Sequence, residues 1–536
     1  MPGAGAAIAK DADIGRTTRR FNIPPAYARI AAAAGVSPCT FHAALRHSKQ
    51  VRSPAKLLLS ICALTLTAHA AVVEGVILDE ESGNPLARTQ VSLTPLPGTL
   101  ADVTAVRTGA RGSFVILSVI PGWYVLRATR RGYAPTESGQ LRPGRPGRAF
   151  QVADDRASGF LEIHMSRLPA ITGAVLDENG IGMPRRTVHI YSANKPIRHI
   201  GQTDTDDRGN YRIGELDPGS YLLRSTEGHL EDETPILATY TRSALDLADA
   251  VPTTVRYGET AHDINIRPIK GRLLTLSGMF LPPTSEFAWA ILTMITDTGR
   301  REIAAGNKDR PFSIPGVQPG TVEFLVKGND GFGNECGSYS LVTTDKDVTT
   351  LRLACNPLRK SSISISGATP KSPIIVRRVD LDGALDPHPL GPDESLAPGH
   401  WEISVPRGDY YVQSVRSLGF PPAAHVGAWW GFDTGSDARI GIQLSTRAAS
   451  ISGVVSTGGS PVAGAPIFLT QQGSGESWNG RSDPQGDYLM GGLAPGTYSI
   501  MSGFDLDIAA SRSSKTETIG TSEGNTTVHA LELILP

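Results

Sequence analysis

Short segments in which apolar and polar residues alternate run along most of the chain after residue 70. Following Gly122, for example, Tyr124, Leu126 and Ala128 alternate with Arg127. A period of two is typical of a half-buried β-strand, because successive side chains point to opposite faces of a sheet. Turns rich in Gly and Pro separate these segments, and we find no convincing amphipathic helix after residue 70. The pattern therefore predicts antiparallel β-sandwiches rather than alternating βαβ units.

Two sets of glycines show that the pattern is repeated five times. An opening glycine, inside the first apolar segment of each copy, lies at Gly75, Gly173, Gly278, Gly367 and Gly453. A closing glycine lies at Gly122, Gly219, Gly320, Gly408 and Gly496. Both sets recur at intervals between 86 and 105 residues, so two independent markers share one period. Copies three and four are degenerate, and their assignment depends mainly on this spacing.

The turns of the three clear copies (one, two and five) have a readable chemistry. A hairpin glycine lies ten residues before the closing glycine, at Gly112, Gly209 and Gly486. In residues 483–486, Asp at the first position and Pro at the second favour a type I turn completed by a left-handed glycine. The Pro-Gly pairs before Tyr221 and Tyr498 favour type II turns, in which glycine takes a positive φ.

We therefore predict an all-β chain, a tandem array of about five antiparallel β-sandwich modules of prealbumin-like or immunoglobulin-like type after an N-terminal signal segment. Residues 1–50 are predicted to be disordered or not translated. The remaining predicted segments are a signal peptide at 51–70, module one at 71–168, module two at 169–270, a degenerate module three at 271–356, a degenerate module four at 357–447, and module five at 448–536.

The signal segment has the three parts of a secretory leader. Arg52 and Lys56 precede the apolar run Leu57–Thr67, and a small-x-small site ends at Ala70. We expect cleavage after Ala70, with translation starting at Val51. The alternative is that residues 1–56 form a disordered cytoplasmic tail before an uncleaved anchor. Cleavage would place the mature chain in the periplasm, on the outer surface or outside the cell, with the membrane contacted only through the transient signal segment.

Composition argues against several classes of function. Lys plus Arg (51) and Asp plus Glu (52) nearly cancel, which leaves a formal net charge of −1. Such a chain has no overall field that would attract nucleic acid, so we expect no nucleic-acid partner. After cleavage, Cys336 and Cys355 are the two cysteines left, and in an oxidising compartment we predict that they form a disulfide. The alternative is a pair of buried free thiols.

Motifs within the clear copies resemble a known family. The order G-x-V-x-D, G-x-P-L, V-x-L, G-x-F/Y and P-G-x-Y, seen in residues 72–135, 170–224 and 450–502, resembles the carboxypeptidase regulatory-like domain. The resemblance implies a transthyretin-like β-sandwich related to carbohydrate-binding-like folds. It also implies a non-catalytic module that accompanies peptidases or outer-membrane receptors, so it transfers no catalytic residue.

One aromatic cluster is a candidate binding site. Trp429, Trp430 and Phe432 form the densest group of aromatic residues in a chain that is 6% aromatic. Flat aromatic faces on a loop are suited to stacking on sugar rings, and exposed aromatic groups mark contact surfaces. The alternative interpretation is that the tryptophan pair closes the junction between modules four and five.

Other candidate sites are weak. Residues 204–215 have the glycine and glutamate spacing of a calcium loop, but Arg208 occupies a ligand position and Gly209 is already explained by the hairpin. His189, between two apolar residues, is expected on the solvent face of a strand. The sequence contains no G-x-S-x-G, H-E-x-x-H or C-x-x-C motif. We therefore predict no catalytic residue, metal site or cofactor, and no enzymatic activity.

The sequence thus predicts a secreted, non-catalytic structural or adhesive array with weak carbohydrate binding. Its partner would be a polysaccharide or another envelope protein. Two alternatives remain: a dedicated glycan-binding protein, and a soluble accessory fragment of an outer-membrane receptor system.

Overall fold

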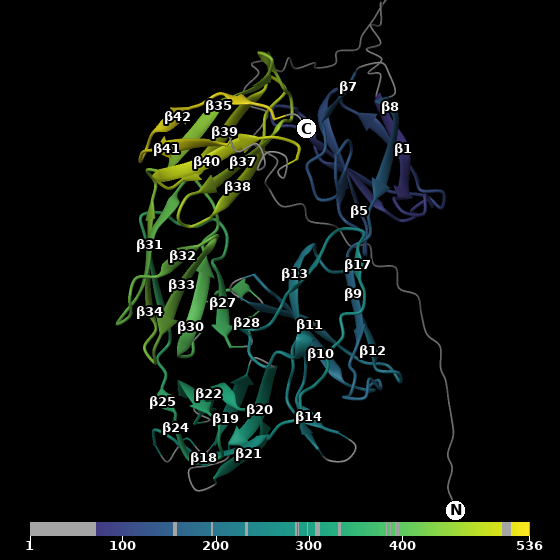
Figure 1. The fold of residues 1–536 in the computed structure, drawn as a ribbon. Helices are drawn as coiled ribbons and strands as arrows, with labels where there is room; N and C mark the ends of the chain where they lie inside the picture. The colour runs from purple at the N-terminus through teal and green to yellow at the C-terminus, as the bar shows by residue number, and fades with distance from the viewer. Residues whose placement is uncertain are drawn as a thin grey trace, which may run out of the picture. The chain divides into compact units, whose positions relative to one another are not determined.

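The computed structural model describes residues 71–534, except 154–157, 195–196, 231–233, 285–286, 288, 297–298, 306–310, 331–333, 382, 386, 392–393, 395 and 506–515. The predicted disordered segment, the signal peptide and its cleavage site after Ala70 lie outside the described residues. All described residues belong to one unit by their internal contacts, Ala68–Pro536. They form strands, turns and one short 3-10 helix, η1 (Thr241–Ser243) (Figure 1). The prediction of an all-β array of sandwich modules is confirmed.

In four modules, one of the two sheets is built around the first strand. That strand pairs antiparallel with the strand before the closing turn and parallel with the last strand of the module. These sheets contain β1 (Ala71–Asp79), β4 (Ser113–Val119) and β8 (Ser158–Met165); β9 (Ala170–Ala174), β12 (Asn210–Ile213) and β17 (Thr260–Ala261); β18 (Leu274–Leu281), β21 (Phe312–Val317) and β24 (Val348–Ala354); and β35 (Ala449–Thr457), β36 (Ser460–Pro461), β39 (Asp487–Leu493), β42 (Thr526–Val528) and β43 (Leu531–Glu532).

The second sheet of the same modules centres on an antiparallel pair whose later strand begins at the closing glycine. Its strands are β2 (Gln90–Pro95), β3 (Thr104–Arg107), β5 (Gly122–Thr129), β6 (Thr136–Glu137) and β7 (Phe150–Val152); β10 (Thr187–Ser192), β11 (Arg198–Asp204), β13 (Gly219–Ser225) and β16 (Thr253–Val255); β19 (Trp289–Thr296), β20 (Gly299–Ala305), β22 (Gly320–Asn329), β23 (Glu335–Thr344) and β25 (Asn356–Pro357); and β37 (Pro466–Gln471), β38 (Ser477–Arg481), β40 (Gly496–Ser502) and β41 (Glu517–Thr521). A small separate pair is β14 (Gly228–His229) with β15 (Pro235–Ile236).

Module four has a different first sheet. Here the last strand is central, between the parallel first strand and an antiparallel third partner. Its strands are β26 (Ser362–Ser366), β34 (Arg439–Ser445) and β31 (Tyr411–Ser417), and the second sheet contains β27 (Ile375–Asp380), β28 (Gly383–Ala384), β29 (His388–Pro389), β30 (Gly399–Ser404), β32 (Ala424–Val426) and β33 (Trp429–Thr434). This second sheet is continuous with that of module two, because β28 pairs antiparallel with β11.

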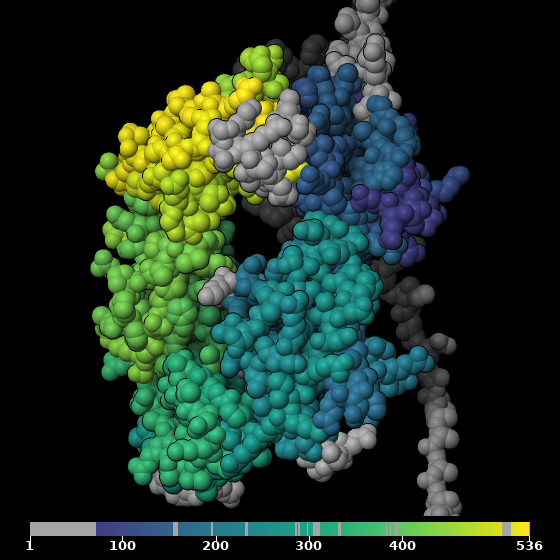
Figure 2. All heavy atoms as spheres, viewed as in Figure 1, coloured from purple at the N-terminus to yellow at the C-terminus, as the bar shows by residue number. Residues whose placement is uncertain are grey.

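Each module has a hydrophobic core of its own. Five large clusters of buried side chains are found, and each lies within one of the residue ranges 71–165, 171–266, 274–355, 363–444 and 449–534. On the face shown in Figure 2 the atoms of each module are closely packed. Burial of these apolar side chains between two sheets is the main stabilising contribution in a sandwich.

The opening glycines allow two backbones to approach each other. A Cβ atom on these residues would lie between 1.8 and 2.2 Å from a carbonyl oxygen of the segment that ends the same module. The pairs are Gly75 with Leu161, Gly173 with Ile264, Gly278 with Leu351, Gly367 with Leu444, and Gly453 with His529. All five modules, including the two degenerate ones, therefore need glycine at this position.

The hairpin turns have the predicted geometry. Gly112, Gly209 and Gly486 have φ values of 69°, 78° and 85°, and each donates its N–H to the carbonyl oxygen three residues earlier. In module two, a carboxylate oxygen of Asp206 accepts the N–H groups of Arg208 and Asn210. These backbone hydrogen bonds lower the pKa of Asp206. The carboxylate that resembled a calcium ligand thus organises its own turn.

The closing turns differ from the prediction in two respects. Gly219 has no positive φ, and Gly496 has a φ of 153°, so these residues begin extended strands instead of completing type II turns. In module four the equivalent glycine is Gly399, because β30 begins there and pairs with β27. The assignment of Gly408 was wrong, since β31, which follows it, belongs to the other sheet.

An aromatic donor secures most closing turns. The hydroxyl groups of Tyr124, Tyr221 and Tyr498 donate to the carbonyl oxygens of Ile120, Asp217 and Ala494, four residues earlier, at 2.6 to 2.7 Å. In module four, Trp401 Nε1 donates to the Ala397 carbonyl oxygen at 2.8 Å. This hydrogen bond explains the tyrosine of the P-G-x-Y motif. Because Tyr410 makes the same contact to the Pro406 carbonyl oxygen, the strand pairing and not this bond identifies Gly399 as the closing glycine of module four.

Candidate functional site

The aromatic cluster predicted from the sequence is divided by the strand that carries it. Successive residues of β33 point to opposite faces of the sheet, so Trp429 and Trp430 do not form one platform. The Arg377 guanidinium lies 3.9 Å from the centroid of the Trp429 ring. Phe432 is 3% exposed and packs in the core of module four, which removes it from the predicted contact surface.

Trp430 lines a cleft between modules four and five. The cleft has a volume of about 410 Å³, and aromatic, amide and charged side chains contribute to its walls. His425, directly opposite Trp430 on β32, stacks on its ring at a centroid distance of 4.2 Å and an interplanar angle of 5°. Tyr410 and Trp478 contribute further aromatic surface. The cleft therefore combines flat rings with polar groups, the usual composition of a small-molecule site.

The charged groups of the cleft centre on one carboxylate. Glu476 lies 3.3 Å from the Arg407 guanidinium and 3.4 Å from His425 Nε2. Arg407 also donates to the Ser477 carbonyl oxygen at 2.6 Å, and its guanidinium lies 4.7 Å from the centroid of the Trp478 ring. Because both arginine contacts restrain the side chain, the carboxylate and the guanidinium are held in place before any ligand arrives.

The chemistry available in the cleft is that of binding. The lining, taken over the described residues, contains no serine, cysteine, lysine or second carboxylate beside Glu476. Burial raises the pKa of Tyr410, so this hydroxyl keeps its proton at neutral pH and donates to the Pro406 carbonyl oxygen at 2.7 Å. An activated nucleophile needs a base in hydrogen-bond reach, and these lining residues do not provide such a pair.

The first module can now be compared with known families, since its paired sheets and its glycine and tyrosine positions are established. Residues 72–153 match the carboxypeptidase regulatory-like domain. The resemblance seen in the sequence is confirmed for this regulatory-like module. Among curated proteins, no match to the chain was found.

Solved structures that match the chain include several pilins. The Bacillus anthracis TIE protein is 10% identical, with 86% of this chain and 74% of that chain covered and a TM-score of 0.17. A minor pilin of Streptococcus agalactiae is 14% identical over 38% of this chain and 97% of its own, with a TM-score of 0.23. BcpA, the major pilin subunit of Bacillus cereus, is 11% identical over 68% of this chain and 99% of its own, with a TM-score of 0.13. At these TM-scores the likenesses carry no argument about function.

The predicted cysteine pair lies in the core of module three. Cys336 on β23 and Cys355, directly after β24, are 0% and 2% exposed and are joined by a disulfide, with their Cα atoms 5.3 Å apart. The bond connects the second sheet of the module to the end of the first. It is remote from the cleft and contributes to stability rather than to binding.

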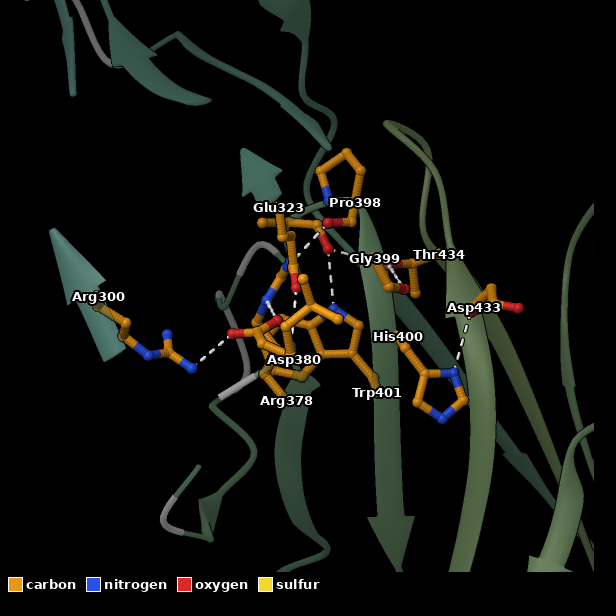
Figure 3. A network of polar contacts seen from close by, with 12 residues as sticks. Arg300, Glu323, Arg378, Asp380, Pro398, Gly399, His400, Trp401, Asp433 and Thr434 are labelled. Carbon is orange, nitrogen blue, oxygen red and sulfur yellow. Dashed lines mark hydrogen bonds and ion pairs between the residues drawn. The ribbon is translucent and has the colours of Figure 1, made fainter. Parts of the chain in front are cut away.

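A buried polar network, which the sequence did not reveal, connects modules three and four (Figure 3). Arg378 lies between two carboxylates, with Nε 2.5 Å from Asp380 and an NH2 nitrogen 3.3 Å from Glu323. Arg300 contacts the other oxygen of Asp380 at 2.6 Å. Burial raises the pKa of Glu323 to about 7, and the nearby Asp380 charge adds to this effect. The network is enclosed, so it joins modules and does not offer a surface to a ligand.

The expectation for His189 was wrong. This side chain is 8% exposed, with Nδ1 3.0 Å from Nε2 of His199, and burial lowers its pKa to about 4. The reason is that β10 of module two is covered on both faces: Val188 and Ile190 lie in the core, while Tyr191, on the same face as His189, packs in a second apolar cluster with Leu222 and Tyr240. A period of two predicts which residues share a face but does not show whether another segment covers it.

Proposed function

We propose that this chain is a non-catalytic structural or adhesive protein of the bacterial cell envelope, and that its cleft between modules four and five binds a saccharide unit. The His425–Trp430 stack beside the Glu476–Arg407 pair carries the second part of the proposal. A stacked ring surface favours the apolar face of a sugar, while the carboxylate and guanidinium suit its hydroxyl groups.

Several features support a structural or adhesive role in the cell envelope. A tandem array of sandwiches, each with a separate core, suits a spacer or adhesive role. A disulfide is stable in the oxidising compartments outside the cytoplasm. Among the described residues, no helix has the length and apolar character needed to span a bilayer. The secretory leader predicted before residue 71 supports export, and the volume of the cleft falls within the usual range for small ligands.

Retention on immobilised polysaccharides tests the proposal. A glycan array with the purified full chain would first identify a ligand. Trp430→Ala should then reduce retention at least tenfold, because it removes the stacking surface, and Glu476→Gln should reduce it by removing the charge while keeping the shape.

Phe160→Ala is a matched control, because this aromatic residue is 64% exposed and lies in module one, away from the cleft. It should retain full binding. Thermal unfolding of all three variants would show that each remains folded. Unchanged retention of a folded Trp430→Ala variant would contradict saccharide binding at the cleft.

A further inference from the structure

A second pocket lies on the outer face of module one. The strand register places Arg107 of β3, Gln90 of β2 and Thr129 of β5 in one row across three neighbouring strands. Their side chains lie on the solvent side of the sheet, since the alternate residues Val91 and Ala128 are buried. The pocket has a volume of about 500 Å³, and its polar lining residues are Arg88, Gln90, Arg107, Thr129, Arg130 and Arg131.

The pocket is strongly basic. Four guanidinium groups and no carboxylate line it. Arg130 donates to the Ala87 carbonyl oxygen and lies 5.7 Å from the centroid of the Tyr133 ring. Arg131 pairs with Glu215 at 3.0 Å, but both side chains are largely exposed, so this pair is weak. For Arg88 and Arg107, the described part of the chain supplies no carboxylate partner.

Module two shows that the fold does not require these charges. Thr108 and Thr205 are equivalent, because each buried hydroxyl donates at 2.6 Å to the carbonyl oxygen that lies 22 residues earlier. The residue before each is Arg107 in module one and Asp204 in module two. Asp204 accepts a hydrogen bond from the Thr187 hydroxyl, so the same row is acidic there. In module five the residue before the equivalent Ser482 is Arg481, which is paired with Glu137, so a basic residue recurs there but is matched by a carboxylate.

The type of cation adds to this argument. Residues 71–168 contain eleven arginines and no lysine. The planar guanidinium donates two parallel hydrogen bonds to carboxylate, sulfate or phosphate groups, which the ammonium group of lysine does not. Arg88 is also held by its backbone, which has a φ of 58° and donates to the Thr108 carbonyl oxygen. Such arginines form a prepared site for planar or tetrahedral anions.

We propose that this pocket binds an acidic polysaccharide through its anionic groups. Gln90 and Thr129, in the same row as Arg107, are suited to the neighbouring hydroxyl groups of such a polymer. The lining includes no aromatic side chain for stacking on nucleic-acid bases, and the net charge of −1 gives no long-range attraction to nucleic acid. This site is separate from the cleft between modules four and five and does not depend on it.

Binding of the full chain to defined polymers tests the proposal. Polygalacturonate and dextran sulfate should bind, and binding should weaken as salt is added, because each contact replaces a bound counterion. Neutral dextran should not bind. Tighter binding of duplex DNA than of either acidic polysaccharide would overturn the proposal, and so would equal binding of neutral dextran.

Charge-matched variants separate the pocket from general electrostatics. The double variant Arg88→Asn with Arg107→Gln should lower affinity for polygalacturonate at least tenfold and flatten its salt dependence. Asparagine is chosen at position 88 because it tolerates the left-handed backbone. The control, Arg111→Gln with Arg208→Gln, removes the same charge from two exposed hairpin residues outside the pocket and should bind as the unchanged protein does.

Two comparisons complete the test. Equal affinity of the pocket variant and the control variant would overturn the proposal, provided that thermal unfolding shows both to be folded. Trp430→Ala should leave binding to polygalacturonate unchanged. The acidic-polysaccharide site and the proposed saccharide cleft can therefore fail independently.

Discussion

A glycine at the opening position has a structural role in every module. Gly453 of β35 lies so close to the end of module five that a Cβ atom would be 1.8 Å from the His529 carbonyl oxygen. Tyr488, the cross-strand partner of Gly453, lies beside the same Cβ position and donates its hydroxyl to the same oxygen at 2.6 Å. The ring thus covers the space that a side chain would otherwise fill. Gly453 allows the parallel last segment of the module to approach the first strand, and the Tyr488 hydroxyl holds it there.

Gly453→Ala should therefore destabilise module five. The added methyl group cannot be accommodated by a rotamer change, because the opposing atom belongs to the backbone, so we expect a loss of about 3 kcal/mol in the free energy of unfolding. Denaturant unfolding of the full chain would measure it. Gly520→Ala is the control: this glycine lies on β41 of the same module, has no positive φ and has open space at its Cβ position. A loss of similar size in both variants would contradict the close-approach explanation.

At the scale of the strand, the disulfide connects β23 to the end of β24 within module three. Replacing both Cys336 and Cys355 by alanine should lower the free energy of unfolding of this module by about 3 kcal/mol, because the cross-link restricts the unfolded chain over a separation of 19 residues. Thermal unfolding with and without a reducing agent would measure the change.

Peptide mass spectrometry of the unreduced protein should recover Cys336 and Cys355 in one linked species. Labelling of both thiols by an alkylating agent, in protein unfolded without a reductant, would contradict the pairing. The unchanged protein under reducing conditions should unfold at the temperature of the double variant. This comparison separates the effect of the bond from that of the altered side chains.

Most strands could be predicted because their signals are local. The alternation after Gly122 and the left-handed glycines at Gly112, Gly209 and Gly486 follow from steric rules within a few residues. A further local signal was overlooked: Thr108, Thr205 and Ser482 each lie four residues before a hairpin glycine, and their buried hydroxyls accept a backbone N–H and donate to a carbonyl oxygen. In module four, spacing led to Gly408, whereas the pairing of β30 with β27 identifies Gly399.

The sites were less predictable because they depend on contacts between distant segments. The sequence indicated Trp430 through its aromatic neighbours, but Glu476 and Trp478, on the other side of the cleft, come from the next module. Trp429 and Phe432 were grouped with Trp430, but Trp429 points to the opposite face of the strand, and Phe432, on the same face as Trp430, is buried in the core of module four. Residues that meet across two modules in this way belong to no common sequence motif or repeating pattern, so the sequence does not show that they are in contact.

At the scale of the whole molecule, sequential modules are joined by buried polar contacts as well as by linkers. Between modules three and four, Glu323 and Asp380 have side chains that are 1% and 0% exposed, and Arg378 lies between them (Figure 3). A small apolar cluster of Ile295, Leu325 and Ala397 lies at the same joint. Two carboxylates share this central guanidinium, and Arg300 contacts Asp380. For the ionised form of Glu323, the attraction to Arg378 is therefore smaller than the desolvation penalty of burial, which agrees with the raised pKa of this residue.

The raised pKa makes the stability of this joint depend on pH. The groups facing Glu323 are Asp380, Arg378, Tyr339 and the Leu381 N–H. With a pKa of about 7 in the folded chain and a lower ordinary value in the unfolded chain, Glu323 keeps a proton between pH 5 and 7 that the unfolded chain has released. Folding is favoured below this range, and the contribution is lost as the pH rises through 7. Glu323 should therefore lower the midpoint of thermal unfolding as the pH rises from 5.5 to 8, whereas the buried His189, whose pKa is lowered to about 4, acts in the opposite direction over the lower part of this range.

Glu323→Gln isolates this contribution, because the amide resembles the protonated carboxyl group and does not titrate. The variant should show a smaller fall in its unfolding midpoint from pH 5.5 to pH 8 than the unchanged protein, and at pH 8 it should be at least as stable. Glu302→Gln, an exposed position on β20 of the same module, should keep the full pH dependence. Calorimetry at both pH values would measure all three proteins. Equal pH dependence in the Glu323→Gln variant and the unchanged protein would show that Arg378 keeps Glu323 ionised, and the joint would then be a fully charged network at every pH in this range.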